Sequence, residues 1–281
     1  MFEKKLLGHS GCDIRLIEEG PFRFVRKFSS SPDYNHRLKA QCDKQRGYSA
    51  GSFKVPRVMG EGTDGGLYYF DMEYIQGVTL AKRLERMHMS DVPKIARELF
   101  DAIYGAGPAC GAGSHLGDVI REKARSTYAA IDSPGIEVET AFRLLVGHDW
   151  SLVGPGGCHG DMTFENIMIS NGELYLIDFL DSFCDSWVID MAKVYQDVDS
   201  MWSFRASAKN NTSVKLLVMR NLFDRWLSLA DPLLVVEVRY MLLLNLLRIY
   251  PYAGDRETVL FLDGRLSCVL DEIRKIERAC R

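Results

Sequence analysis

Residues 157–182 read GCHGDMTFENIMISNGELYLIDFLDS and carry the strongest structural signal in the chain. The segment predicts a loop, a short strand from Ile167 to Ser170, a turn at Asn171-Gly172 and a second strand from Leu174 to Phe179. Asn-Gly is the pair that two-residue β-hairpin turns prefer. Because the hairpin folds the second strand back beside the loop, we expect Asp178 to lie close to Asp161, although 17 residues separate them.

The polar residues of this segment suit the transfer of a phosphoryl group. Such a reaction needs a carboxylate that orients the attacking hydroxyl and accepts its proton, and oxygen ligands for the Mg²⁺ ions that bridge the nucleotide phosphates. Asp161 and Asn166 share the loop, and Asp178 ends the second strand. Two carboxylates and an amide in this order therefore predict a site where phosphate, metal and hydroxyl meet.

Residues 1–75 are predicted to form mainly strands. The run from Ile14 to Phe28 contains two alternating apolar and polar stretches around Glu19-Gly20-Pro21, as a β-hairpin does. A helix is expected from Tyr34 to Tyr48, after a break at Pro32-Asp33. Two further strands are expected at FKVPRVMGEG (residues 53–62) and GLYYFDMEYI (residues 66–75).

From about Gly77 onward the pattern becomes helical. The segments VTLAKRLERM and VPKIARELFDAI place apolar residues at helical spacing, whereas residues 105–118 are rich in glycine and predict a loop. Four more helical segments follow Trp187: WVIDMAKVYQDV, VKLLVMRNLFDRWLSL, PLLVVEVRYMLLLNLLRIY and TVLFLDGRLSCVLDEIRKIERA. We therefore expect an α+β protein with a small antiparallel-sheet lobe, residues 1–75, and a larger, mainly helical lobe, residues 76–281.

The motif HGDxxxxN followed by IDF (residues 159–166 and 177–179), together with the two-lobe pattern, resembles the aminoglycoside phosphotransferase and choline kinase superfamily of protein-kinase-like small-molecule kinases. The resemblance covers nearly the whole chain, and the residues of the two motifs are typical of bacterial members of the superfamily. It implies that the protein binds ATP and Mg²⁺ and moves the γ-phosphoryl group to a hydroxyl of a sugar, amino alcohol or aminoglycoside-like acceptor. By the same resemblance, the site residues would have these roles: Asp161 the catalytic base, Asn166 and Asp178 the magnesium ligands, His159 and Asp190 supports of the loop.

Lys27, near the end of the predicted hairpin, resembles the lysine that pairs with the α- and β-phosphates in kinases of this kind. Side chains alternate along a strand, so only one of Arg26 and Lys27 can point into the cleft, and we expect Lys27. The helix partner of this lysine is usually Glu, but no Glu lies between residues 20 and 60. Asp43 is the expected partner, with Asp33 as the second choice.

Two main-chain segments complete the expected nucleotide site. Met72-Glu73-Tyr74-Ile75-x-Gly77 resembles the hinge between the lobes, where the backbone of Glu73, Tyr74 and Ile75 would hydrogen-bond the adenine edge. The segment from Leu7 to Cys12 contains Gly8 and Gly11 but does not match GxGxxG. Two interpretations of this segment remain: its backbone contacts a phosphate, or it is an ordinary hairpin turn.

The charge is unevenly distributed along the chain. The formal net charge of −3 over 281 residues divides into +2 for residues 1–75 and −5 for the rest, and no Lys or Arg occurs from Leu144 to Ala192. Asp181 and Asp185 lie in this segment, and the resemblance assigns them neither metal binding nor a structural role. We therefore expect them to help bind a cationic or polyhydroxylated acceptor. For Arg248, at the end of an apolar helix, a capping role is favoured over a place at the acceptor.

Other classes of protein fit the composition poorly. The near-neutral balance of charges argues against a non-specific nucleic-acid binder. The sequence contains no apolar run of about 18 residues, the length that would predict a membrane span. The first residues lack the pattern of a signal peptide, and seven scattered cysteines without CxxC indicate reduced thiols in the cytoplasm. Two alternatives stay open: a non-catalytic kinase-like nucleotide-binding or scaffold protein, and, with weaker support, a hydrolase that uses Cys158 with His159.

Overall fold

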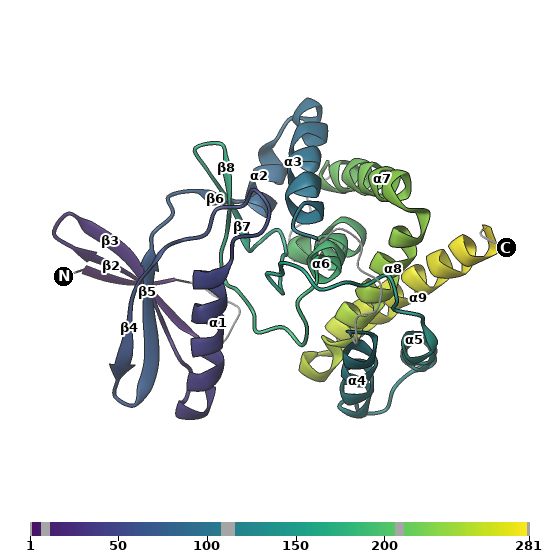
Figure 1. Ribbon diagram of the computed structural model, residues 1–281, viewed down its shortest axis with the longest axis horizontal. Coiled ribbons are helices and arrows are strands. Elements are labelled where there is room, and N and C mark those ends of the chain that lie inside the picture. Colours follow the sequence, from purple (N-terminus) through teal and green to yellow (C-terminus); the bar gives the residue numbers. More distant parts are fainter. Residues whose placement is uncertain (1, 7–11, 108–115, 206–210, 280–281) are drawn as a thin grey trace.

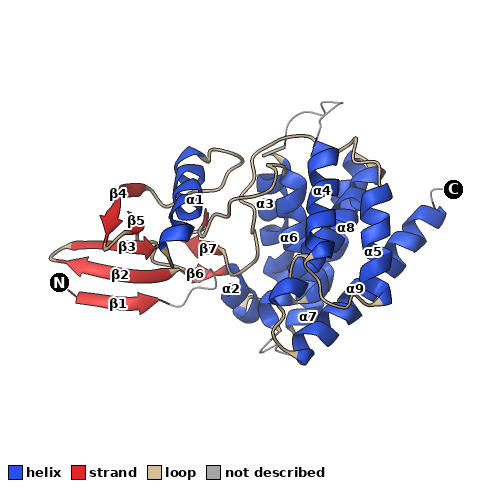
Figure 2. Cartoon of the chain, turned by 90° about the horizontal axis from the view of Figure 1, so that it is seen from below, coloured by secondary structure: helices blue, strands red, loops and turns tan. Residues whose placement is uncertain are grey.

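The computed structural model describes residues 2–6, 12–107, 116–205 and 211–279. An antiparallel sheet with one helix forms the first lobe, and a group of packed helices forms the second (Figures 1 and 2). This is the α+β, protein-kinase-like architecture that the sequence predicts. The expected glycines Gly8 and Gly11 lie outside the described residues.

The first lobe is built on a five-stranded sheet with the strand order β1-β2-β3-β5-β4. Its strands are β1 (Phe2–Leu6), β2 (Asp13–Glu19), β3 (Phe22–Phe28), β4 (Val58–Asp64) and β5 (Leu67–Glu73). Helix α1 (Asn35–Gly47) packs on β5, and its buried residues Leu38 and Cys42 join the apolar face of the sheet. The fourth strand begins at Val58 and not at Phe53, because Pro56 has no N–H to donate to a neighbouring strand.

A second, three-stranded sheet connects the lobes. Its strands are β6 (Val78–Thr79), β7 (Ile167–Ser170) and β8 (Glu173–Leu176), in that order. The predicted turn forms, with φ of +50° at Asn171 and +80° at Gly172. The last strand ends at Leu176, before the predicted end at Phe179, since Asp178 has a φ of +61° that a strand does not accommodate.

The second lobe consists mainly of helices. They are α2 (Leu80–Arg86), α3 (Val92–Tyr104), α4 (Leu116–Ala129), α5 (Ile136–Gly147), α6 (Trp187–Ser200), α7 (Thr212–Ala230), α8 (Pro232–Leu247) and α9 (Arg256–Ala279). Short 3₁₀ turns lie at Pro32–Tyr34, Met89–Asp91, Trp202–Phe204 and Tyr250–Tyr252. Helices α6 and α8 are almost entirely buried and pack against each other at the centre of the lobe. No described helix has the length and apolar character needed to cross a membrane.

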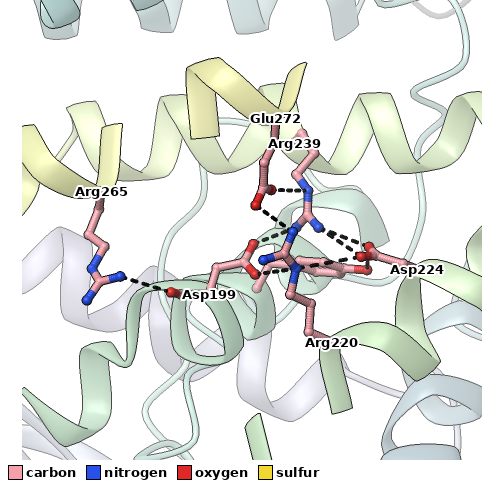
Figure 3. Close-up of polar contacts among 7 residues, drawn as sticks. Asp199, Arg220, Asp224, Arg239, Arg265 and Glu272 are labelled. Carbon is pink, nitrogen blue, oxygen red and sulfur yellow. Dashed lines mark hydrogen bonds and ion pairs between the residues drawn. The ribbon is translucent and has the colours of Figure 1, made fainter. Parts of the chain in front are cut away.

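A network of charges around the buried Arg239 connects four of these helices (Figure 3). Arg239 of α8, which is 1% exposed, forms ion pairs with Asp199 of α6, Asp224 of α7 and Glu272 of α9. Arg220 of α7 also reaches Asp199, at 3.0 Å. The guanidinium of Arg239 stays charged in the core because carboxylates surround it, so the network fixes how the helices pack around the site described below.

We expect Arg239→Leu to lower the free energy of unfolding by about 3–5 kcal/mol, since the change removes the buried cation and leaves Arg220 alone to neutralise three carboxylates. Urea denaturation followed by circular dichroism measures the effect. Arg274→Leu is the matched control, because Arg274 forms an exposed pair with Asp271 within α9, worth about 0–1 kcal/mol. Equal losses in the two variants would contradict the stabilising role of the network.

Candidate active site

The loop that follows the glycine-rich segment at residues 154–157 is held against the turn after β8 by backbone hydrogen bonds. Ile177 N–H donates to Asn166 O (3.0 Å), and Leu180 N–H donates to His159 O (3.1 Å). Between them, Gly160 has a φ of +93°, and a Cβ there would collide with Ser182 and Leu180. Only glycine fits this position, and the close approach brings the predicted residues of the loop next to Asp178.

Helix α6 supports the loop with side chains spaced along one face. Asp190 accepts hydrogen bonds from the backbone N–H groups of His159 (2.6 Å) and Gly160 (2.8 Å), although burial raises its pKa to about 6. Lys193 forms an ion pair with Asp161 at 3.0 Å, and Asp197 accepts from Phe164 N–H at 2.6 Å. Residues three and four apart share a helix face, so this one helix positions the whole loop.

Asp161 lies at the centre of this arrangement with both carboxylate oxygens held. Oδ1 faces Lys193, and Oδ2 accepts from the side-chain nitrogen of Asn166 at 3.1 Å. Burial alone would raise the pKa of Asp161, but the attraction of Lys193 leaves it below its ordinary value. The carboxylate is therefore ionised and fixed, ready to accept a hydrogen bond from a bound hydroxyl.

His159 is fully buried and takes a structural position. Its Nδ1 accepts from Asp161 N–H (3.3 Å), which leaves the proton on Nε2 to donate to Ile177 O (2.8 Å). The ring packs against Phe179, and burial lowers its pKa to about 4. The imidazole is therefore neutral near pH 7 and links the loop to the turn that carries Asp178.

Cys158 precedes His159 but does not form a nucleophile with it. The thiol is 2% exposed, and burial raises its pKa far above the usual range. Its sulfur lies 3.7 Å from the Asp190 carboxylate, whose charge opposes a thiolate. These contacts do not support the hydrolase alternative.

Asn166 and Asp178 present oxygens that suit a hard cation. The Asn166 nitrogen donates to the backbone oxygen of Asp161 (2.8 Å) as well as to its carboxylate, so the amide oxygen points the other way. Asp178 Oδ1 bonds Lys27, while Oδ2 has no partner among the described residues. Amide and carboxylate oxygens next to a space for phosphates match the ligands that Mg²⁺ takes in nucleotide sites.

Lys27 points into the cleft, and Arg26 points away from it. Lys27 is 2% exposed and contacts Asp178 from the other lobe, whereas Arg26 pairs with Asp71 on the opposite face of the sheet. The predicted partner is wrong: Gln41, and not Asp43, lies at the Lys27 amine, with Nζ to Oε1 at 3.1 Å.

Asp43 does not contact Lys27 because it lies on the solvent side of α1. Asp43 is about half exposed and pairs with Lys39 and Arg46 on the solvent side of the helix. Asp33, the second choice, is exposed on the 3₁₀ turn before α1. Neither carboxylate faces Lys27, so Gln41 provides the only contact of α1 with this amine within the described residues.

A cavity of about 400 Å³ lies between the lobes and opens at Lys27 and Asp178. The cavity has largely apolar walls, formed by Ile14, Val25, Phe70, Met72, Met168 and Ile177. The predicted hinge residues Glu73, Tyr74 and Ile75 form one edge. Glu73 N–H donates to Arg57 O, whereas the N–H groups of Tyr74 and Ile75 bond no group in the described structure. This cavity suits a flat, partly apolar group that hydrogen-bonds main chain.

A second cavity of about 870 Å³ adjoins the first, and Asn166 and Asp178 line both cavities. Asp181 lines this second cavity, but Asp185 does not, because its carboxylate is turned to Lys44 at 2.7 Å. Arg248 is the C-cap residue of α8, but its guanidinium donates to the Asn245 side chain and lies in the cavity wall, so the side chain takes the second of the two roles considered, a place beside the cavity. Asp161 thus lies in the wall of the second cavity, in contact with Asn166, which lines both cavities.

Sequence reasoning missed several residues of the site. Lys193 is the single basic residue in an acidic segment and follows Asp190 by three positions, a spacing that places both on one helix face. Gln41 could have been found from the buried stripe of α1, since Leu38, Cys42 and Gln45 share its face. Arg37 and Lys123 carry no local signal, because they reach the second cavity from distant segments.

Comparisons with known proteins agree on one fold. The model of the phosphotransferase enzyme family matches residues 15–211. A search of curated proteins gave no match. Among solved structures, a thermostable mutant of aminoglycoside phosphotransferase APH(4)-Ia, in a ternary complex with ADP and hygromycin B, has a TM-score of 0.67 and 16% identity over 96% of this chain and 93% of that chain.

Two further similar structures carry different names and ligands. APH(2″)-IIa, in a ternary complex with streptomycin and ATP, has a TM-score of 0.56 and 14% identity over 96% of this chain and 91% of that one. A protein assigned as a fructosamine-3-kinase from Haemophilus somnus 129PT has the same TM-score, identity and coverage. At these identities the likeness establishes the fold and leaves the acceptor open.

Proposed function

Because the chain belongs to the phosphotransferase enzyme family, we propose that it is an ATP-dependent kinase that transfers the γ-phosphoryl group to a hydroxyl of a small molecule. The observation that carries the proposal is the position of Asp161. Its carboxylate is ionised, fixed by Lys193 and Asn166, and lies in the wall of the larger cavity, next to the Asn166 that also lines the nucleotide-sized one. We place the reaction in the cytoplasm, where ATP is supplied.

In this proposal the adenine occupies the apolar cavity and bonds the backbone near Tyr74 and Ile75. Lys27 contacts the α- and β-phosphates, and its bond to Asp178 fixes the distance between the lobes. Asn166 and Asp178 would hold Mg²⁺, which when bound offsets the negative charge that develops on the phosphates. Gly8 and Gly11 remain proposed backbone contacts to the phosphates, on residues outside the described part of the chain.

The acceptor hydroxyl would donate its hydrogen bond to Asp161 and point its oxygen at the γ-phosphorus. As the new O–P bond forms, the bond from phosphorus to the bridging oxygen of ADP breaks, and the hydroxyl proton passes to the Asp161 carboxylate. A pKa below the ordinary value makes Asp161 a weak base. It acts mainly by orienting the hydroxyl, since a loose transition state acidifies the attacking oxygen only late.

An ADP-release assay over a panel of acceptors tests the proposal. The panel holds sugars, amino alcohols and aminoglycosides, each with and without Mg²⁺. We expect at least one class to raise ADP release above the rate without acceptor, and only with Mg²⁺. A protein that binds ATP in a thermal-shift assay but releases no ADP with any acceptor would favour the non-catalytic nucleotide-binding alternative.

The contact between Lys27 and Gln41 leads to a further prediction. Gln41→Leu is expected to raise the KM for ATP about threefold to tenfold, because the buried amine loses one of its two partners. Asp43→Asn, two residues along the same helix, is expected to leave this KM unchanged, since Asp43 faces solvent. A raised KM for ATP in Asp43→Asn, with an unchanged KM in Gln41→Leu, would identify Asp43 as the partner of Lys27.

A further inference from the structure

The second cavity contains an unusual group of cations. Arg37 of α1, Lys123 of α4 and Arg248 at the end of α8 all line it. None of the three lines the apolar cavity assigned to the nucleotide. Three elements that are distant in sequence therefore bring positive charge to one wall on the acceptor side of Asp161. We call these three residues the cation cluster.

The cation cluster has no carboxylate partner in the described part of the chain. The neighbouring Lys193, in contrast, pairs with Asp161. Arg248 contacts neutral groups: its Nη1 donates to Asn245 Oδ1 at 3.3 Å, and its guanidinium lies over the Phe183 ring at 5.2 Å. The side-chain nitrogen of the fully buried Asn245, in the same wall, has no partner among the described residues.

The charges of the cation cluster repel one another. Burial lowers the pKa of Lys123, and the charges of Arg248 and Arg37 lower it further, with no acid opposing them. Burial also lowers the pKa of Arg248, although Asp161 acts against this shift. Cations that repel one another in a partly buried wall destabilise the empty site, and a bound anion would relieve that repulsion.

We propose that the acceptor carries an anionic group, a carboxylate or a phosphate, which Arg37, Lys123 and Arg248 bind while its hydroxyl lies at Asp161. This inference rests on the proposed phosphotransferase activity and narrows its acceptor. Arginine binds carboxylate and phosphate through paired N–H donors, and the Asn245 contact orients Arg248 for that purpose. The cavity of about 870 Å³ has room for such a group beyond the hydroxyl.

Two other occupants fit the cluster less well. A polycationic aminoglycoside, such as the ligands in the complexes with similar folds, would meet like charges at this wall. The γ-phosphate of ATP would approach from the cavity that Lys27 lines, and the cluster lies outside that cavity. Asp181 also lines the acceptor cavity and could bond hydroxyl or amino groups of the same molecule.

Matched acceptors test the proposal. Glycerol, glycerate and glycerol 3-phosphate form one set, and glucose, glucuronate and glucose 6-phosphate form a second. Within each set, one hydroxymethyl group is oxidised to a carboxylate or phosphorylated, and the other hydroxyl groups stay the same. We expect kcat/KM to be about tenfold or more higher for an anionic member than for the neutral one, and the two anions show whether carboxylate or phosphate is preferred.

Variants of the cluster locate the effect. Arg248→Gln, Lys123→Met and Arg37→Gln should each lower kcat/KM for the anionic acceptor about tenfold, with the KM for ATP unchanged. Arg37 is exposed, so its variant is not expected to disturb folding. Arg125→Gln is the control on α4, because Arg125 pairs with Glu122 on the exposed side of that helix. It should leave every constant unchanged.

A binding measurement separates this inference from the proposed function. Glycerate and glycerol 3-phosphate are titrated calorimetrically into protein saturated with the non-hydrolysable nucleotide AMP-PNP and Mg²⁺, and we expect about tenfold weaker binding in the cluster variants. Anion binding without phosphoryl transfer to any acceptor would contradict the proposed function alone. A preference for neutral or cationic acceptors, no anion binding to the wild type, or cluster variants that change only the KM for ATP would overturn the inference.

Discussion

Asp161→Asn is expected to lower kcat by about 10³- to 10⁴-fold while leaving nucleotide affinity nearly unchanged. Asparagine keeps the size of the side chain but cannot accept the proton of the acceptor hydroxyl. Its amide group also loses the ion pair with Lys193 and places N–H groups where Asp161 accepts two contacts. The nucleotide cavity does not depend on this carboxylate for its apolar walls or its hinge edge.

Steady-state ADP release and calorimetric titration of ATP measure the two effects separately. Asp185→Asn is the matched control, since Asp185 is exposed, pairs with Lys44 and lies outside the second cavity. The control should keep wild-type kcat. A loss of ATP binding in Asp161→Asn equal to its loss of turnover would mean that Asp161 holds the nucleotide and not the hydroxyl.

Asp178→Ala is expected to remove both activity and the effect of Mg²⁺ on nucleotide affinity. The proposed metal site loses a carboxylate, and the buried Lys27 amine loses its charged partner in the other lobe. Loss of a metal ligand at a phosphoryl-transfer site removes several kcal/mol of transition-state stabilisation, so kcat/KM should fall about 10³-fold or more.

The measurement is a titration of AMP-PNP with and without Mg²⁺. In the wild type we expect Mg²⁺ to tighten binding, and in Asp178→Ala we expect the two curves to coincide. Asp185→Ala should behave as the wild type does. Preserved Mg²⁺ dependence in Asp178→Ala would remove Asp178 from the proposed metal site, and Asn166 with another carboxylate such as Glu165 would then be tested.

The fold could be predicted from local signals because its elements are defined locally. Asn171-Gly172 specifies the hairpin, and the alternating run at residues 14–28 specifies two strands. The same reasoning placed Asp161, Asn166 and Asp178 in one region, as the structure has them. The end of β8 was misplaced because the left-handed backbone at Asp178 is set by tertiary contacts of the turn, which an apolar strand pattern does not reveal.

The sequence predicts Asp43 as the partner of Lys27 because a lysine amine favours a carboxylate. Residue type alone does not show which side of the helix faces the lysine. Residues two apart on a helix point to nearly opposite sides, so a helix that buries Gln41 must expose Asp43. The buried position is filled by an amide, which bonds the lysine without bringing a second acid beside Asp178.

The charge of the acceptor site could not be predicted from the sequence at all. Residues 144–192 contain no Lys or Arg, which favoured a cationic or polyhydroxylated acceptor. In the structure, five basic residues from outside that segment line the second cavity: Arg37, Lys123, Lys193, Arg205 and Arg248. The charge of one segment predicts the charge of a cavity only when that segment forms the whole wall. Residues 144–192 form only one side of the second cavity.

Phosphorus-31 NMR of a reaction mixture tests the central claim most directly. The wild-type protein is incubated with ATP, Mg²⁺ and the acceptor panel, and the spectrum is followed with time. We predict a new phosphomonoester resonance that grows as the γ-phosphate resonance of ATP declines, that requires Mg²⁺, and that Asp161→Asn does not produce. Loss of the γ-phosphate only to inorganic phosphate, or an equal phosphomonoester signal from Asp161→Asn, would contradict transfer to a hydroxyl at Asp161.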